Sequence, residues 1–171
     1  MHKSPDTILA IDPGLRDLGY AVLTRRKLVA SGVLPLRQLP KALRLREVRR
    51  QVRHWLRAHR PRAIIVEKTY RHPVPWLDRL HRITLYARRL ARRRGLRFAT
   101  YAPQQVRRTV LGNGKGKKSE VAAVVAAHFP SLRIYLTQDR RWKERYWQNM
   151  FDAVALALHH HAVRKPPSRS R

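Results

Sequence analysis

The sequence contains no cysteine, and only ten of its 171 residues are acidic. Without cysteine there can be no disulfide, no thiol catalysis and no cysteine-ligated zinc. No apolar run approaches the roughly 18 residues that cross a bilayer, and the N-terminal letters MHKSPD precede no apolar signal region. We therefore expect a cytoplasmic protein without membrane contact. The missing cysteine and the abundant arginine also suit a thermophilic source.

The scarcity of acids leaves an extreme positive charge. Thirty-nine Lys and Arg residues against ten Asp and Glu residues give a formal net charge of +29. Self-repulsion on this scale disfavours a compact chain unless a polyanion neutralises it. Membrane surfaces, acidic proteins and nucleic acids are the candidate partners. Arg outnumbers Lys, which favours nucleic acid because guanidinium groups bind phosphates in a bidentate manner.

The hydrophobic pattern predicts a single α/β domain over residues 1–163 and a basic tail at 164–171 whose composition cannot pack. Hydrophobic residues make up 43% of the chain, which is enough for a core at this length. Short apolar runs predict strands at residues 8–12, 18–23, 27–33, 62–67 and 96–101. Helical spacing predicts helices at 41–59, 76–94, 103–111, 120–128 and 146–163. Ser119 is the predicted cap of the fourth helix, and residues 133–136 are predicted to be extended.

Three of the few acids stand where a carboxylate is costly unless it is paired or bound to a cation. Asp12 and Glu67 each end an apolar strand, and Asp152 lies beside the apolar face of the last helix. Such carboxylates can converge on hydrated Mg²⁺, which takes oxygen ligands. Singly, each acid has an alternative: Asp12 as a turn residue, Glu67 paired with an arginine, and Asp152 bonded to Gln148. Together, in so basic a chain, they favour a metal-dependent nuclease.

Four segments of the chain stand out as motifs: IDPGLRDLGYAVL at 11–23, AIIVEKTY at 63–70, YAPQQVRRTVLGNGKGKKSEVA at 101–122 and FDAVALALHH at 151–160. They resemble the RuvC family of Holliday-junction resolvases, within the ribonuclease-H-like superfamily. Their order covers almost the whole chain, and a phage or thermophile member would fit the composition. The resemblance implies a ribonuclease-H-like fold with a mixed five-stranded sheet flanked by helices.

The same resemblance implies an activity and partners. It implies a homodimer that cuts four-way DNA junctions symmetrically with two Mg²⁺ ions, leaving 5′-phosphate ends. Mn²⁺ can substitute for Mg²⁺ in this chemistry. The sequence preference of the cut and any branch-migration motor that acts as a partner are not readable from the sequence.

By position, the resemblance implies that Asp12, Glu67 and Asp152 are catalytic metal ligands. Family members carry an Asp or His one helical turn before the last of these, where this chain has Asn149. An amide oxygen can ligate a cation or a water, but it brings no charge and cannot act as a base. Asn149 is therefore predicted to be a weaker fourth ligand that reduces or abolishes activity. Two explanations stay open: a natural variant that works with three charges, or a substitution that inactivates the enzyme.

Several basic and aromatic positions also match the family. Arg107 and Lys118 resemble its catalytically important lysines, and either can stabilise charge on the scissile phosphate. Ordinary phosphate contact is the alternative for both. Lys115 and Lys117, in the same basic loop, are predicted to bind nucleic acid. Tyr70 matches an aromatic residue that stacks on a base, with packing inside its own loop as the alternative.

Other patterns and functions compete with this interpretation. The loop GNGKGKKS lacks the spacing of a Walker-type phosphate loop, so ATP binding is not expected. Consecutive helical residues point in different directions, so His159, His160 and His161 predict a solvated helix end favoured by the dipole rather than a metal site. The alternative functions are a non-catalytic nucleic-acid-binding protein and a ribonuclease-H-like nuclease acting on RNA or other branched DNA.

Overall fold

Five strands form one mixed sheet in the computed structural model, which describes residues 6–71, 73–136 and 141–164, without the side chains of 75–77 and 141–145. The strands are β1 (Thr7–Asp12), β2 (Asp17–Thr24), β3 (Lys27–Pro35), β4 (Ala63–Glu67) and β5 (Arg97–Tyr101). Their order in the sheet is β3-β2-β1-β4-β5. The β3-β2-β1 part is antiparallel, whereas β1, β4 and β5 run parallel. The predicted mixed five-stranded sheet is confirmed.

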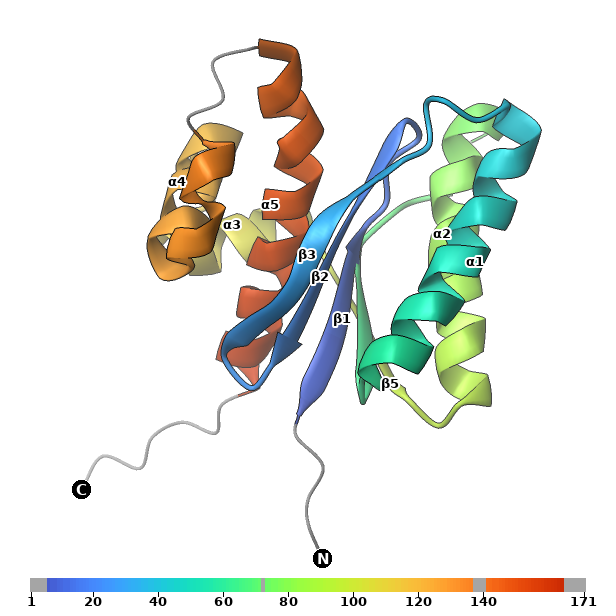
Figure 1. The fold of residues 1–171 in the computed structure, drawn as a ribbon, viewed down its shortest axis with the longest axis horizontal. Coiled ribbons are helices and arrows are strands. Elements are labelled where there is room, and N and C mark those ends of the chain that lie inside the picture. The colour runs from blue at the N-terminus through green and yellow to red at the C-terminus, as the bar shows by residue number, and fades with distance from the viewer. Residues whose placement is uncertain (1–5, 72, 137–140, 165–171) are drawn as a thin grey trace, which may run out of the picture.

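Helices cover both faces of this sheet (Figure 1). On one face lie α1 (Lys41–His59) and α2 (Pro75–Arg93). On the other lie α3 (Pro103–Leu111), α4 (Lys118–His128) and α5 (Arg141–Val163). The apolar spacing that predicted α1 is the spacing of its buried residues, Val48, Val52, Trp55 and Leu56.

The alternation of side chains along β1 decides which way its carboxylate points. Leu9 and Ile11 pack in the core beneath α1 and α2, whereas Ile8 and Ala10 pack in the core beneath α3, α4 and α5. Successive strand residues face opposite sides of a sheet, so Asp12 falls on the α5 side. A register slip of one residue would turn Asp12 into the core beneath α1 and α2 and would exchange the cores into which the four apolar residues before it pack.

The close approach of α5 to the sheet occurs at Gly19 in β2. A Cβ added to this glycine would lie 1.8 Å from the backbone oxygen of Asn149, far inside van der Waals contact. The absence of a side chain therefore lets the helix lie directly against the strand. This contact sets how far Asp152, one turn later on α5, stands from the sheet.

Two segments differ from the sequence-based prediction. The extended piece predicted at 133–136 is wrong, because Pro130–Tyr135 form a 3-10 helix. Proline at its first position favours a helical start, since its φ is already fixed near the helical value. The last helix begins at Arg141 rather than at residue 146, because its charged first turn shows no apolar periodicity in the sequence.

The start of α4 also differs. Ser119 is not its cap, because the helix already begins at Lys118. The Glu120 carboxylate instead accepts a hydrogen bond from the Lys117 backbone N–H. Except for Arg164, the predicted tail lies outside the described residues. Within the described part of the chain, no helix is long and apolar enough to cross a membrane.

Candidate active site

Two carboxylates meet at the carboxyl edge of the sheet. β1 and β4 are parallel neighbours whose register pairs Ile11 with Val66, so Asp12 and Glu67 are the next residues of the two strands. Ile65 packs in the core beneath α5, and the strand alternation therefore places Glu67 on the same face as Asp12. Asp12 is only 7% exposed, and Glu67 is half-buried. The predicted convergence of the two strand ends is thus present.

The third carboxylate, Asp152, approaches from α5. Its Oδ1 accepts a hydrogen bond from Gln148 Nε2 at 2.9 Å, and its Oδ2 lies 3.2 Å from Lys118 Nζ. Gln148 Nε2 also lies 3.4 Å from the backbone oxygen of Lys118. The local bond from Gln148, which the sequence allowed as an alternative to a functional role, therefore coexists with an ion pair to Lys118. Gln148 holds Asp152 and the first residue of α4 together.

A small hollow opens between these elements. Its volume is 70 Å³, which corresponds to roughly two water molecules at about 30 Å³ each. Its charged lining consists of Glu67, Arg107, Lys118 and Asp152. Carboxylates and cations from β4, α3, α4 and α5 therefore face one space. Arg107 and Lys118, which were predicted to contact phosphate, line this hollow together with Glu67 and Asp152.

Burial and mutual repulsion raise the pKa values of the acids. Burial is the main cause of the pKa of Asp12 lying well above its usual 3.8, and repulsion from Glu67 and Asp152 adds to it. Burial, followed by repulsion from Asp152, raises the pKa of Glu67 from 4.5 to about 7. Burial alone would lower the pKa of Lys118, but attraction to the three carboxylates leaves it raised. The acids thus form one electrostatic cluster that a cation stabilises.

The donor set of this cluster suits a hard divalent cation. Asp12, Glu67 and Asp152 offer only oxygen ligands, which Mg²⁺ prefers, and a bound cation relieves the repulsion that raises their pKa values. In the described part of the chain, however, no three His, Asp or Glu side chains are gathered closely enough to hold a metal ion as they stand. The ammonium of Lys118 instead supplies positive charge next to Asp152.

Asn149 faces the turn between β1 and β2. Its Nδ2 donates a hydrogen bond of 2.7 Å to the backbone oxygen of Asp17. A Cβ on Gly14 would lie 3.1 Å from the same nitrogen, so the amide packs directly on the turn that follows Asp12. Asn149 does not line the hollow between Glu67 and Asp152. Its amide therefore braces the turn.

An ion pair between Asp17 and Arg37, which was not predicted from the sequence, also holds this turn. Asp17 is 5% exposed, and both of its carboxylate oxygens accept hydrogen bonds from the Arg37 guanidinium. The burial of an acid at the start of an alternating strand was the available signal. Two contacts, one to Arg37 and one to Asn149, thus fix the residue that ends the turn.

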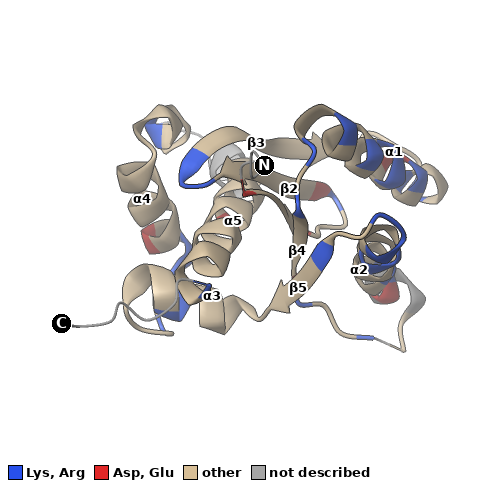
Figure 2. Cartoon of the chain, turned by 90° about the horizontal axis from the view of Figure 1, so that it is seen from below, with Lys and Arg blue, Asp and Glu red and all other residues tan. Residues whose placement is uncertain are grey.

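The other predicted nucleic-acid-binding residues lie on the surface. Tyr70 is 66% exposed, and the Lys68 ammonium lies 5.2 Å from the centre of its ring. Lys115 and Lys117 are exposed in the loop before α4. Lys and Arg residues also occur along α1 and α2, where acidic residues are few (Figure 2).

The histidines near the end of α5 are packed rather than solvated, which corrects the sequence-based prediction. His159 and His160 are 5% and 4% exposed. His159 Nδ1 lies 2.7 Å from Thr109 Oγ1, and His160 Nδ1 lies 2.9 Å from the Tyr101 hydroxyl. Burial lowers the pKa of His159 and His161, so charge attraction to the helix end does not hold them. Contacts with Thr109 on α3 and Tyr101 on β5 thus help to bury His159 and His160.

Acidification is expected to destabilise the fold through His160. Burial is the main reason why the pKa of His160 falls from 6.5 to about 4, with Arg164, His161 and Arg97 also lowering it and Asp6 raising it. The folded state keeps this ring neutral while the unfolded chain protonates it, so its contribution is present above pH 6.5 and is lost as pH falls towards 4. Urea unfolding should show that the free energy of unfolding is about 2 kcal/mol lower at pH 5 than at pH 7.5. His160→Gln should flatten this dependence, and an unchanged acid slope in that variant would contradict the assignment.

Comparison with known proteins decides the family. A family model described as "Crossover junction endodeoxyribonuclease RuvC" matches residues 8–160. The chain belongs to the RuvC family. RuvC of Methylorubrum populi is 33% identical over 162 residues, covering 90% of this chain and 78% of the relative. RuvC of Azorhizobium caulinodans is 31% identical over 173 residues, covering 96% and 94%.

The fold of this RuvC-family chain also matches solved structures. A structure of Thermus thermophilus RuvC in complex with Holliday junction substrate superposes with a TM-score of 0.68 at 25% identity, covering 92% of this chain and 94% of that one. The ribonuclease-H-like fold predicted from the four segments is confirmed. The chain is a nuclease, and RuvC-family nucleases depend on metal ions.

Proposed function

We propose that this RuvC-family nuclease resolves four-way DNA junctions by paired, symmetric, Mg²⁺-dependent cuts that leave 5′-phosphate ends. The observation that carries the proposal is that Asp12 and Glu67, at the ends of the parallel neighbours β1 and β4, lie within electrostatic reach of Asp152 on α5 in a chain of net charge +29. A basic surface holds the polyanion through its phosphates, and the local acidic cluster concentrates the cations that hydrolysis needs. A Holliday junction is the substrate bound by the Thermus thermophilus relative.

The side chains at this site have different roles in the proposed cleavage. Asp12, Glu67 and Asp152 would hold two Mg²⁺ ions, which activate the attacking water and stabilise the leaving oxygen when bound. Arg107 and Lys118 line the same hollow and stabilise the additional charge that develops on the scissile phosphate. Gln148 keeps Asp152 turned towards Lys118 through the 2.9 Å bond. Asn149 steadies the turn after Asp12 and lends, at most, a neutral amide oxygen.

The active unit in this proposal is a homodimer, because resolving a junction takes two related cuts. α2 is the proposed interface, where Leu85 is 37% exposed. Tyr70, exposed in the loop after β4, would stack on an unpaired base. Lys115 and Lys117 contact phosphates from the loop before α4.

A second candidate is a junction-binding protein that does not cut. Asn149 is the observation that favours it, because its amide is used for the turn and brings no charge to the acidic cluster. Under this alternative the carboxylates and Lys118 would be a residual site, and the basic surface alone would carry the function.

One experiment separates the candidates. The protein is incubated with labelled four-way junction, linear duplex and RNA–DNA hybrid of matched sequence, in Mg²⁺ and in EDTA. Cleavage of the junction alone, and only with Mg²⁺, is the expected result. Binding of the junction without any cleavage would favour the second candidate. Equal cutting of all three substrates would overturn the proposed selectivity.

Replacing Lys118 by methionine is expected to reduce junction cleavage about 100- to 1,000-fold, the usual effect of losing one donor to transition-state charge. Its Nζ is 3.2 Å from Asp152 and lines the hollow where the phosphate would react. Binding of the junction in EDTA should change little, because one phosphate contact among many is lost. Single-turnover cleavage and gel-shift binding measure the two effects separately.

Lys117→Met is the matched control, since Lys117 is exposed and immediately precedes Lys118 in the same loop. The cleavage rate of the Lys117→Met variant should fall no more than a few-fold. If both variants lose cleavage in proportion to binding, then Lys118 acts only as a phosphate-backbone contact.

A further inference from the structure

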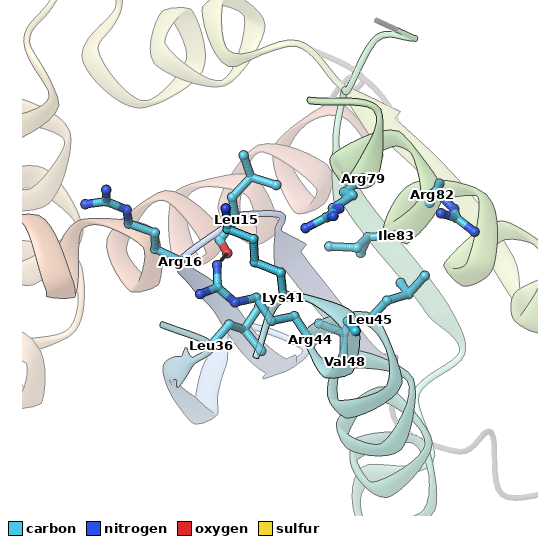
Figure 3. A pocket seen from close by; sticks show the side chains of 12 residues that line it. Leu15, Arg16, Leu36, Lys41, Arg44, Leu45, Val48, Arg79, Arg82 and Ile83 are labelled. Carbon is cyan, nitrogen blue, oxygen red and sulfur yellow. Dashed lines mark hydrogen bonds between the residues drawn. The ribbon is translucent and has the colours of Figure 1, made fainter. Parts of the chain in front are cut away.

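A second hollow lies on the opposite side of the sheet from the acidic cluster, between the N-terminal halves of α1 and α2 and the β1–β2 turn (Figure 3). Its volume is 430 Å³, within the range of roughly 300–1,000 Å³ that small-molecule sites occupy. Nothing in the proposed cleavage chemistry uses it. The hollow is six times larger than the 70 Å³ space between the acids.

The walls of this hollow are aliphatic. Leu15 comes from the β1–β2 turn, and Leu36 directly follows β3. Leu45 and Val48 lie on α1, and Ile83 lies on α2. Leu36, Val48 and Ile83 are 1%, 0% and 5% exposed, so the walls are fixed parts of the core. No aromatic side chain lines the hollow among the described residues. The faces of a flat group can contact these walls while its polar edge points out to the basic rim and to solvent.

The rim of the hollow is cationic. Arg16, Lys41, Arg79 and Arg82 surround it, and no acid lines it in the described part of the chain. None of the four enters the ion pairs seen among the described residues. Arg79 points across the hollow towards the turn, whereas Arg16 and Arg82 point outward at its edges (Figure 3). The rim therefore presents positive charge around an apolar interior.

Arg44, the fifth basic residue that lines the hollow, binds the surrounding backbone instead. Its guanidinium donates to the backbone oxygens of Leu39, Leu15 and Arg37 at 3.1, 2.9 and 3.4 Å. These bonds tie the β1–β2 turn and the segment before α1 to one side chain. The mouth of the hollow is thus preformed rather than assembled by a ligand.

Charge decides between the candidate occupants. The cations of the rim have no acid among the described lining residues to pair with, and a symmetric contact between two copies through this face would set the same cations against each other. The proposed dimer contact at Leu85 also lies elsewhere, since Ile83 and Leu85, two residues apart at about 100° per residue, point to nearly opposite sides of α2. An occupant with a flat apolar part and flanking negative charges fits both the walls and the rim.

We infer that this hollow receives an unpaired base of the bound DNA, while Arg16, Lys41, Arg79 and Arg82 hold the phosphates on either side. The inference rests on the proposed function, because a four-way junction supplies both the polyanion and the bases that open near its exchange point. It adds a base-binding site that is separate from the acidic cluster and from Tyr70. Aliphatic walls offer no donor or acceptor to the edge of a base, so the site selects unpaired structure rather than sequence.

The β1–β2 turn connects this site with the cleavage site. Leu15 and Arg16 line the hollow and follow Asp12 by only a few residues. Asp17, the next residue, accepts the hydrogen bond from Asn149 on α5. A base seated in the hollow therefore presses on the same turn that positions Asp12. Cleavage should accordingly be faster when an unpaired base is available.

The test uses the full chain and a four-way junction carrying the fluorescent base 2-aminopurine at each position beside the exchange point, in EDTA. The fluorescence should rise at one position per half-junction, because a base leaves the stack and enters walls that contain no quenching aromatic ring. Ala42→Phe at the exposed mouth of the hollow should abolish the rise and weaken junction binding about tenfold. Ala58→Phe, an exposed alanine near the other end of α1, should change neither quantity.

A second pair of variants tests the rim without filling the hollow. Arg82→Ala should weaken junction binding and lower the fluorescence signal, whereas Arg57→Ala, an exposed arginine at the far end of α1, should affect binding only slightly. If Ala42→Phe keeps the full signal and affinity, the base site is overturned. Conversion of a dimer to a monomer by Ala42→Phe in sedimentation would overturn it in favour of a second copy.

The outcomes also separate this inference from the proposed function. Junction cleavage by the unaltered chain in Mg²⁺ is measured independently of the fluorescence in EDTA. A signal that depends on Ala42 in a protein that never cuts would support the base site and overturn resolution. Normal cutting with a signal that Ala42→Phe leaves intact would overturn the base site alone.

Discussion

Glu67→Gln is expected to abolish cleavage and, in metal-free buffer, to stabilise the fold. The carboxylate is a proposed metal ligand, and its loss should reduce single-turnover cleavage by at least about 1,000-fold. At the same time, burial and repulsion from Asp152 hold the pKa of Glu67 at about 7 instead of 4.5. Ionising it therefore costs stability as pH rises from 4.5, and the full cost applies above pH 7. Glutamine removes that cost, which is about 1–3 kcal/mol.

Thermal unfolding at pH 8 in EDTA, together with cleavage in Mg²⁺, measures both halves of this prediction. Glu47→Gln is the matched control, because hydrogen bonds from Arg50 and Gln51 lower the pKa of Glu47 to about 2. That carboxylate stabilises the fold when charged, so its glutamine variant should be slightly less stable and fully active. A Glu67→Gln protein that still cuts at a tenth of the normal rate would contradict its role. A marked loss of stability would show that Glu67 is structural.

Asn149→Asp is expected to make the fold less stable in EDTA and more responsive to Mg²⁺. The Asn149 amide donates a hydrogen bond of 2.7 Å to the Asp17 backbone oxygen. A carboxylate at this position cannot donate that bond and repels the oxygen. The loss of the bond should lower the free energy of unfolding by about 1–3 kcal/mol. Bound Mg²⁺ should restore it, since an additional charged ligand binds the cation in the folded state alone. Cleavage at limiting Mg²⁺ should then exceed that of the unaltered chain.

Asn149→Ala separates the two effects, because alanine loses the hydrogen bond without gaining a charge. It should be destabilised equally in EDTA and in Mg²⁺. Unfolding curves in both buffers and cleavage across a Mg²⁺ titration are the measurements. If the aspartate variant shows the same Mg²⁺ dependence as the alanine variant, residue 149 lies outside the reach of the metal ions.

Local sequence patterns were sufficient to predict much of the fold and the placement of the three acids. The apolar runs that end in Asp12 and Glu67 are short and β-branched, and both form buried parallel strands whose ends lie side by side. Asp152 could be placed because the apolar stripe of its helix is strong. These residues follow from strand alternation and helical spacing, which are local properties.

Contacts between distant segments could not be predicted in this way. The burial of His159 depends on Thr109, 50 positions away, and the Asn149 amide bonds a residue 132 positions away. The ion pair of Asp17 with Arg37 and the hollow between α1 and α2 depend likewise on tertiary packing. The 3-10 helix at Pro130–Tyr135 was missed because its few residues carry no periodicity of their own.

The central claim is that Asp12, Glu67 and Asp152 form one metal-dependent centre that cuts junctions in pairs. Single-turnover cleavage of a four-way junction, with each strand labelled separately, tests it most directly. In Mg²⁺ the claim predicts nicks at equivalent positions in two opposing strands, 5′-phosphate ends, and no cutting in EDTA. Nicks in one strand only, or cutting that persists in EDTA, would contradict it.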